Sequence, residues 1–251
     1  MALGRAKLAI GQGVSVWVLE APGGFGDAQF HGHHAIQITV SLAGSLMLAS
    51  EERAVSGRAL AVAADARHRF EADGVMAFVF VEPESRAGRA LGKALFGEGP
   101  LAELELARLE PALAPLLATF DAGLAAERLL QAGEEALAAL VPADEPALPD
   151  PRVRRIIDHA AANLDQPLTL AAAAAGVYLS PSRLRHLFVE QTGLAFKTYM
   201  LWLRMVRALH AYAEGGTLTE AAHAAGFADS AHFSRIFKRT FGLPATTLTR
   251  F

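Results

Sequence analysis

The chain of 251 residues contains no cysteine, which excludes disulfide bonds and metal sites built from thiolates. No apolar run approaches the roughly 20 residues that a membrane-spanning helix needs, and the N-terminal MALGRAKLAIGQG lacks the apolar core of a signal peptide. We therefore expect a cytoplasmic protein without a membrane partner. Hydrophobic residues make up 52% of the chain, enough to bury two cores.

The chain also lacks an excess of positive charge, since its formal net charge is −3. The charge is unevenly divided along the sequence. Residues 150–251 carry 12 Lys and Arg against 7 Asp and Glu, a net of +5, whereas the preceding residues carry a net of −8. Binding to nucleic-acid phosphates requires a basic surface, so the distribution favours such a role for the C-terminal part.

One sequence unit occurs twice in this basic part. Residues 168–176 read LTLAAAAAG and residues 218–226 read LTEAAHAAG, with seven of nine positions identical. The likeness continues beyond the glycine at an offset of 49 residues, where Phe188 corresponds to Phe237. A repeat of this kind is interpreted as a pair of structural units, although a single copy would also suit an ordinary helical hairpin in a bundle.

Each copy has the pattern of a short helix, a tight turn and a second amphipathic helix. Gly176 and Gly226 allow backbone conformations that other residues resist, and Ser180 and Asp229 are the expected N-caps of the second helices. Residues 194–212 predict one long connecting helix, about 30 Å in length at about 1.5 Å per residue. Such a helix could hold two helices in successive major grooves, which lie about 34 Å apart on one side of DNA.

The second helix of each copy leaves one face free of apolar side chains. The residues on this face are Ser182, Arg185 and His186 in the first copy and Ser230, Ala231, His232 and Arg235 in the second. In a helix-turn-helix, such a face enters the major groove of double-stranded DNA, where arginine pairs with guanine and serine or histidine reaches base edges. The phosphate contacts are predicted at Lys197, Arg204, Lys238 and Arg239.

The segment AAHAAGFADSAHFSRIFKRTFGLPATTL resembles the signature of the AraC/XylS family of transcriptional regulators. The resemblance covers Pro151 to Arg250, about two fifths of the chain. It implies that the seven residues of the two free faces contact bases, that the partner is promoter DNA, and that the protein forms a homodimer through its N-terminal half. Ala231 stands where the family often has a polar residue, and an alanine there can still contact a thymine methyl group.

The N-terminal part has short β-prone runs that predict an antiparallel barrel or sandwich. These runs are Val14 to Leu19, Ile36 to Leu42, Leu46 to Ala49, Ala59 to Ala63 and Val75 to Val81, broken by Gly24, Gly44, Gly57 and Gly74. From Arg86 to Leu140 the periodicity is helical, with Pro111 and Pro115 dividing the segment. The leucine-rich faces of these helices either pack on their own domain or form a dimer interface.

Several histidines of the β-rich part have the spacing of metal ligands. His31, His33 and Gln37 would share one face of a strand, and His68 lies in the later segment DARHRF. With Gly44, this resembles the cupin metal motif, although Gln37 replaces the usual glutamate and the second motif lacks its usual proline and glycine. The resemblance implies a set of side chains that suits Zn, Ni, Fe or Mn. A pocket for an organic effector at the same four residues is the alternative.

We therefore expect an α+β multidomain protein. Its predicted parts are a cupin-like β-barrel sensor domain at 1–84, a helical extension at 85–141 that could dimerise, a proline-rich linker at 142–151 and a DNA-binding domain of two helix-turn-helix motifs at 152–251. The predicted function is DNA-binding transcriptional regulation controlled by a small molecule or a metal. A cupin-type metalloenzyme with a helical appendage and a helical interaction module are the alternatives. We do not expect an enzyme, because the chain has no nucleophile elbow, phosphate loop or HExxH pair.

Overall fold

The computed structural model describes residues 6–26, 29–120, 125–142, 148–164, 166–242 and 244–245, without the side chains of residues 21–26 and Thr119. The chain divides into two compact units. The first unit comprises Met1–Pro146 together with Ser234–Phe251, and the second comprises Ala147–Phe233. Residues 143–147 of the predicted linker at 142–151 and the chain end with Arg250 lie outside the described residues.

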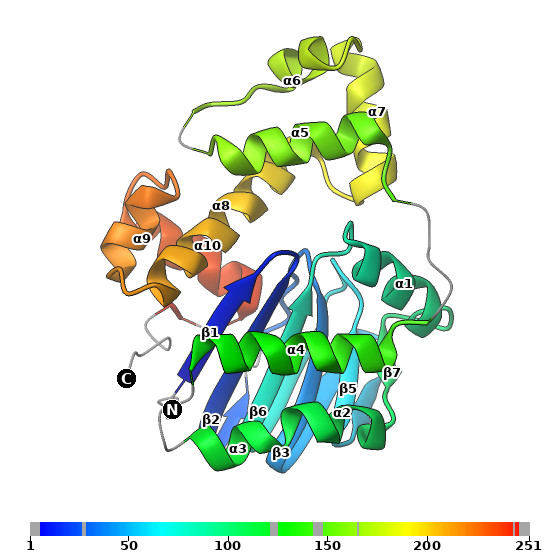
Figure 1. The fold of residues 1–251 in the computed structure, drawn as a ribbon, viewed down its shortest axis with the longest axis vertical. Coiled ribbons are helices and arrows are strands. Elements are labelled where there is room, and N and C mark those ends of the chain that lie inside the picture. The colour runs from blue at the N-terminus through cyan, green and yellow to red at the C-terminus, as the bar shows by residue number, and fades with distance from the viewer. Residues whose placement is uncertain are drawn as a thin grey trace. The chain divides into compact units, whose positions relative to one another are not determined.

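The first unit contains a β-sheet and helices that follow or interrupt its strands (Figure 1). The strands are β1 (Ala6–Gly11), β2 (Val14–Gly26), β3 (Ile36–Ala49), β4 (Ala54–Ser56), β5 (Ala59–Val62), β6 (Arg69–Val81) and β7 (Leu101–Glu103). The helices are α1 (Arg86–Leu95), α2 (Leu106–Leu113), α3 (Pro115–Phe120) and α4 (Ala126–Leu140). Strand β7 was not predicted, and Pro111 lies inside α2 rather than ending it.

The strands form one open antiparallel sheet, so the predicted closed barrel is wrong. Their order is β1-β2-β6-β3-β5-β7, with β4 paired to β3, and among the described residues no strand joins β1 to β7. Helices lie across one face of the sheet instead (Figure 1). Leu109 of α2 and Leu129 of α4 are fully buried in one core with Val16, Ile38 and Val79 of the sheet. This helical layer buries the apolar face, which removes the need for the sheet to close on itself.

Strands β3 and β6 run on through glycines that the sequence pattern treats as breaks. Gly44 and Gly74 are directly paired across the two strands, with φ angles of 92° and 94°. A Cβ atom on Gly44 would lie 1.8 Å from the carbonyl oxygen of Asp73. Two glycines therefore let the backbones approach closely and bend together, and the predicted strands at 36–42 and 46–49 are a single strand.

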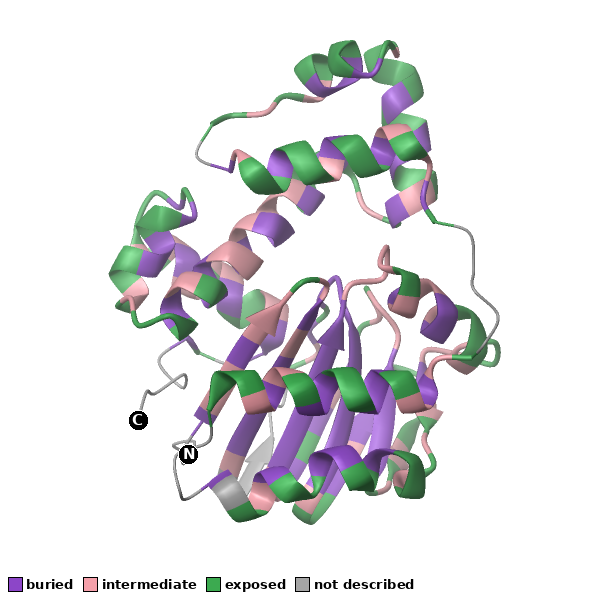
Figure 2. Ribbon diagram, in the orientation of Figure 1, coloured by how far each residue is buried: buried purple, intermediate pink, exposed green. Residues whose placement is uncertain are grey.

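The second unit is helical. Its elements are α5 (Pro151–Ala162), α6 (Leu170–Gly176), α7 (Pro181–Thr192), α8 (Phe196–Ala213), α9 (Leu218–Ala224) and the beginning of α10 (Ser230–Phe241), whose later residues belong to the first unit. Figure 2 shows buried positions alternating with exposed ones along these helices, as amphipathic helices require. In the described part of the chain, no helix is both long and apolar enough to cross a membrane.

The two copies of the repeat fold alike but differ at the turn. The predicted caps are confirmed, because Ser180 accepts a hydrogen bond from the backbone N–H of Arg183 and Asp229 accepts one from that of His232. Gly226 takes the left-handed conformation after α9, with φ 74°. In the first copy this conformation falls on Tyr178, with φ 57°, and not on Gly176, which ends α6. The first copy has one more residue between glycine and cap, so its helix continues further before the chain turns.

Candidate functional site

Three histidines of the first unit gather beside the sheet. His31 and His68 are paired across a two-residue bridge, in which each backbone N–H donates to the other carbonyl at 2.9 Å. One ring nitrogen from each of His31, His33 and His68 lies within 4.8 Å of the others, and all three side chains are buried. The structure therefore brings together three of the four predicted ligands from segments more than thirty residues apart.

Backbone carbonyl groups hold the orientation of these rings. The contacts are His31 Nδ1 to Gln29 O at 3.5 Å, His33 Nδ1 to Ala35 O at 3.0 Å and His68 Nδ1 to Ala66 O at 3.0 Å. A ring that donates its Nδ1–H to a carbonyl keeps Nε2 as a free ligand atom, which is the usual arrangement of metal-binding histidine. Among the described residues, Nε2 of His68 is buried and has no hydrogen-bond partner.

Burial keeps the three rings neutral. It lowers the pKa of His31 to about 4, with a smaller contribution from His33 in the same direction. Burial also lowers the pKa of His33, and it lowers that of His68 well below the ordinary value together with the two neighbouring histidines. Neutral imidazole is the form that binds a metal ion, so the cluster presents metal ligands without first losing protons near neutral pH.

Gln37 places its amide oxygen beside this cluster. Its Oε1 lies 3.0 Å from Nε2 of His33, and its Nε2 donates to Oγ1 of Thr39 at 2.8 Å. Both ring nitrogens of His33 thus face oxygen atoms, although neutral imidazole has a single N–H. A cation bound between the two residues would accept one lone pair from Nε2 of His33 and one from Oε1 of Gln37. Without a cation, Gln37 could donate an N–H to Nε2 of His33 if the oxygen and nitrogen of its amide exchanged places. The donor set fits a divalent ion of the Zn, Ni, Fe or Mn type.

An aromatic cavity, which the sequence analysis did not predict, adjoins the histidines within the first unit. It is small, with a volume of about 10 Å³, which is room for about one water molecule. Its aromatic wall consists of Trp17, Phe70, Phe78, Phe80 and Phe241, and its polar end consists of His31 and Gln37. The signal in the sequence was the alternation of Phe78 and Phe80 on β6, which places both rings on one face of the strand.

His34 points away from the cluster into a separate ionic network. Its Nδ1 lies 2.8 Å from Oδ2 of Asp65, and its Nε2 lies 2.6 Å from Oε1 of Glu84. Asp65 has a φ angle of 61°, a left-handed conformation that aspartate tolerates better than most residues. Burial alone would lower the pKa of His34, but the hydrogen bonds to Asp65 and Glu84 outweigh burial and raise this pKa to about 9.

We expect the stability of the first unit to fall as pH rises from about 6.5 to 9, because protonated His34 holds two carboxylates. A group whose pKa is higher in the folded state than in the unfolded state stabilises the fold when it is protonated. For His34 this stabilisation is complete below the unfolded pKa near 6.5, and it is lost as pH rises through the folded pKa of about 9. The contribution is on the order of 3 kcal/mol. Urea unfolding in the presence of a chelator, at pH 6, 7.5 and 9, measures it.

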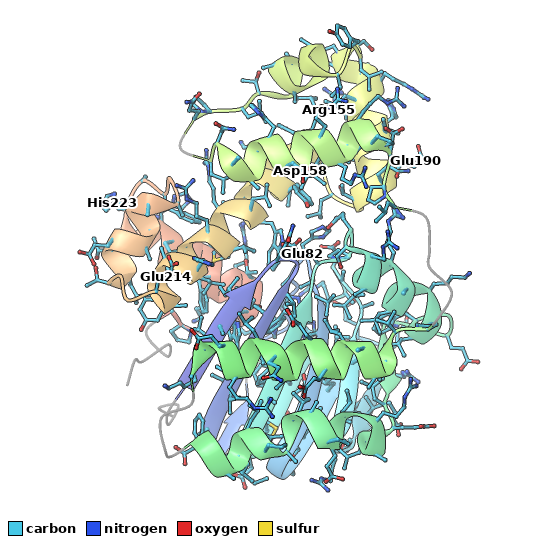
Figure 3. All side chains as sticks on the ribbon, viewed as in Figure 1. Glu82, Arg155, Asp158, Glu190, Glu214 and His223 are labelled. Atoms are coloured by element: carbon cyan, nitrogen blue, oxygen red, sulfur yellow. The ribbon has the colours of Figure 1, made fainter. Side chains whose placement is uncertain are left out.

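The matched variant for this pH dependence is His34→Gln, which cannot titrate. It should be less stable than wild type at pH 6 and nearly equal at pH 9. Nearby Glu82, labelled in Figure 3, stays in both proteins, and burial together with Glu84 raises its pKa. A difference between the two proteins that is the same at every pH would contradict the assigned ion pairs.

The predicted base-reading residues lie on α7 and α10. Ser182, Arg185 and His186 are exposed on α7, as are Ala231 and Arg235 on α10, whereas Ser230 and His232 are half-buried. The ring of His232 packs edge-on against Phe227, with centroids 5.5 Å apart. Other charged side chains of this unit, including Arg155, Asp158 and Glu190, also project from the helices (Figure 3).

The predicted phosphate contacts differ in exposure. Lys197, Lys238 and Arg239 are exposed. Arg204 is half-buried, and its Nε atom is buried without a hydrogen-bond partner in the described part of the chain. This guanidinium lies against the turn at Gly226, where an added Cβ would come within 3.7 Å of Nε. Arg204 is thus placed to support the turn between α9 and α10.

Comparisons with known proteins identify the C-terminal region. Residues 173–250 match the helix-turn-helix domain family. The chain is 37% identical over 84 residues to YpdC of Escherichia coli K12, an uncharacterized HTH-type transcriptional regulator. The alignment covers 32% of this chain and 29% of YpdC. The chain is also 33% identical over 94 residues to the transcriptional activator RhaS of Escherichia fergusonii, and this alignment covers 37% of this chain and 34% of RhaS. The chain therefore spans only about a third of the length of these relatives.

Solved structures show the fold of the whole chain. ToxT from Vibrio cholerae aligns over 98% of both chains with a TM-score of 0.58 and 11% sequence identity. A ToxT structure with a bound unsaturated fatty acid covers 97% of this chain and 94% of that one, with a TM-score of 0.55 and 12% identity. Residues 173–250 therefore form a helix-turn-helix domain similar to that of these transcriptional regulators, and the chain has a fold similar to that of ToxT.

Proposed function

We propose that the protein is a sequence-specific DNA-binding transcription regulator that responds to an effector in its N-terminal unit. The observation that carries the proposal is the pair of helix-turn-helix copies, each presenting an exposed arginine on its second helix. A reading helix needs such an exposed polar face to reach bases in the major groove of promoter DNA. Formation of a homodimer through the N-terminal half remains a prediction from the family resemblance.

The two reading helices are not equivalent, so we propose an asymmetric DNA site. With the helices aligned on Phe188 and Phe237, Arg185 corresponds to Ser234, and Arg235 corresponds to His186. The arginine therefore lies one position later in the second reading helix than in the first. This difference rotates its side chain by about 100° around the helix axis. Each copy should select a different base sequence in its groove.

Replacing Arg235 with alanine should weaken binding to the specific site by about 1 to 3 kcal/mol, roughly 5- to 150-fold, and should relax base preference. The reason is the loss of bidentate hydrogen bonds to a base edge. The site is first selected from random DNA, and the dissociation constants are measured by fluorescence anisotropy on specific and random duplexes.

Lys238→Ala is the matched control on the same helix. It should weaken binding to specific and random DNA alike and reduce the salt dependence of binding, because a phosphate contact carries no sequence information. If both variants lost the same factor on both duplexes, the assigned roles would be wrong. If wild-type protein bound every duplex with equal affinity, the proposed function itself would fail.

For the effector, we propose a small molecule, a metal ion or both, bound in the first unit. ToxT has been solved with an unsaturated fatty acid, which supports a ligand-binding role for a domain of this fold. The buried cluster of His31, His33 and His68 with Gln37 nearby supports a divalent metal. The same cluster favours a metalloenzyme as the second candidate function, and specific DNA binding by the purified protein distinguishes the two.

A further inference from the structure

We infer that His186 is a specificity-determining residue that accepts a hydrogen bond from the exocyclic amino group of a cytosine or an adenine in the major groove. The inference rests on the proposed function, because it requires α7 to be a reading helix. It goes beyond that proposal by naming the chemistry of one base position. The observation that carries it is a hydrogen bond on the surface of α7, which fixes the nitrogen of the His186 ring that holds the proton.

The ring of His186 is bonded to the backbone of its own helix. Its Nδ1 lies 2.8 Å from the carbonyl oxygen of Ser182, one turn earlier on α7. A carbonyl oxygen only accepts hydrogen bonds, so Nδ1 must carry the hydrogen and donate it. A neutral imidazole has one N–H, and Nε2 therefore keeps a lone pair. Among the described residues, the structure gives this Nε2 no hydrogen-bond partner.

The position of His186 makes this lone pair available to DNA. Helix α7 begins after its N-cap Ser180, and Ser182 and His186 are exposed one turn apart on the same side of the helix. The N-terminal turns of a reading helix are the ones that contact base edges. The bond to Ser182 already holds the ring in one orientation, so little conformational freedom of the side chain is lost when DNA binds.

A lone pair needs a donor, and only two bases offer one in the major groove. These donors are the N4 amino group of cytosine and the N6 amino group of adenine, whereas guanine presents N7 and O6 and thymine presents O4, all of which are acceptors. An acceptor facing Nε2 would leave the hydrogen bond unmade on both sides. His186 should therefore favour cytosine or adenine at its position and reject guanine and thymine.

The equivalent residue of the second copy has the opposite hydrogen-bonding character. With the copies aligned on Phe188 and Phe237, Arg235 takes the place of His186. A guanidinium group only donates, and its geometry suits N7 and O6 of guanine. At the same helix position, the first copy should thus select an amino group and the second should select guanine.

The first test measures the tautomer of His186 in the full-length protein without DNA. Long-range proton–nitrogen NMR spectra at about pH 8, where imidazole is ordinarily neutral, distinguish a protonated Nδ1 from a protonated Nε2. The variant His186→Gln identifies the signals of this ring by their loss. We expect a protonated Nδ1, and a protonated Nε2 would overturn the inference.

The second test measures base preference at the same pH. The DNA site is selected from random duplexes, and the position contacted by His186 is the one at which His186→Leu loses its preference. There, wild type should bind cytosine or adenine at least about fivefold more tightly than guanine or thymine, the worth of roughly one hydrogen bond. His186→Arg, which copies the second reading helix, should reverse the preference to guanine.

Base analogues isolate the amino group and separate the two possible bases. A selected cytosine is replaced by 2-pyrimidinone, which lacks the N4 amino group, and a selected adenine is replaced by purine, which lacks the N6 amino group. The replacement should weaken binding by wild type about fivefold and leave binding by His186→Leu unchanged. Both proteins bind the same duplexes, so any change in the duplex itself cancels between them. His159→Leu, which removes an exposed histidine on α5, is the control and should behave as wild type.

The outcomes distinguish this inference from the proposed function. Specific binding that requires guanine or thymine at the His186 position, or in which no position depends on His186, overturns the inference and leaves the proposed function standing. Equal binding of wild type to every duplex overturns both. His186 is exposed, so its variants should fold, and circular dichroism checks that they do.

Discussion

Gly44→Ala is expected to destabilise the first unit by more than about 3 kcal/mol. The backbone conformation of Gly44 is strained for a residue with a side chain, and an added Cβ atom would clash with the neighbouring strand. Gly44 has a φ angle of 92°, and its new Cβ would lie 1.8 Å from the carbonyl oxygen of Asp73. The clash is with the backbone of paired strand β6, which cannot move without breaking the ladder on both sides of Gly74. Urea unfolding of a protein with Trp202→Phe, followed by Trp17 fluorescence, measures the loss.

Gly97→Ala is the matched control for this substitution. No atom lies within 4 Å of a Cβ built on Gly97, so its effect should stay within about 0.5 kcal/mol. The prediction also bears on the site, since β3 carries Gln37 and β6 begins directly after His68. Equal unfolding midpoints for the two variants would contradict the close approach of β3 and β6.

Phe188→Ala is expected to destabilise the second unit by about 3 to 5 kcal/mol and to abolish specific DNA binding at 25 °C. Phe188 is fully buried, and its ring packs edge-on against Phe196 and Tyr199, each with centroids 5.3 Å apart. Removal of this ring leaves a cavity where α7 meets α8. The helix that presents Arg185 would then lose its fixed position.

Unfolding of this unit is followed by fluorescence of Trp202, which lies on α8, in a protein with Trp17→Phe. Val189→Ala is the control, because Val189 adjoins Phe188 on the same helix and is exposed. It should change stability by less than about 0.5 kcal/mol and leave DNA affinity unchanged. The proposed core would be wrong if both variants kept wild-type stability.

The helical part of the chain could be predicted closely because its signals are local. Apolar spacing, an N-cap and a C-terminal glycine lie within a few residues of one another, so Ser180, Asp229 and the repeated glycine sufficed to indicate two helix-turn-helix copies. One local error in the repeat was the turn at Gly176. The first copy has an extra residue before Ser180, and its left-handed conformation lies at Tyr178. The sequence does not indicate which residue of a longer turn adopts this conformation.

The sheet was predicted less well because strand pairing joins distant segments. Gly44 and Gly74 look like breaks when each is considered alone, yet their pairing makes both strands continuous. The sheet likewise stays open because α2 and α4 cover one of its faces. No local sequence pattern predicts this packing. The periodicity of the helices predicted an apolar face but left open whether that face would pack on the sheet or on a partner.

For the functional sites, the sequence by itself determined which residues are available, and tertiary structure decided which of them act together. The spacing of His31, His33, Gln37 and His68 was sufficient to propose a metal set, although the expected shared strand is wrong, because His31 and His33 precede β3. It could not place Trp17, Phe78 and Phe80 beside that set or pair His34 with Asp65 and Glu84. Those contacts join segments that are distant in sequence, and only the folded sheet brings them together.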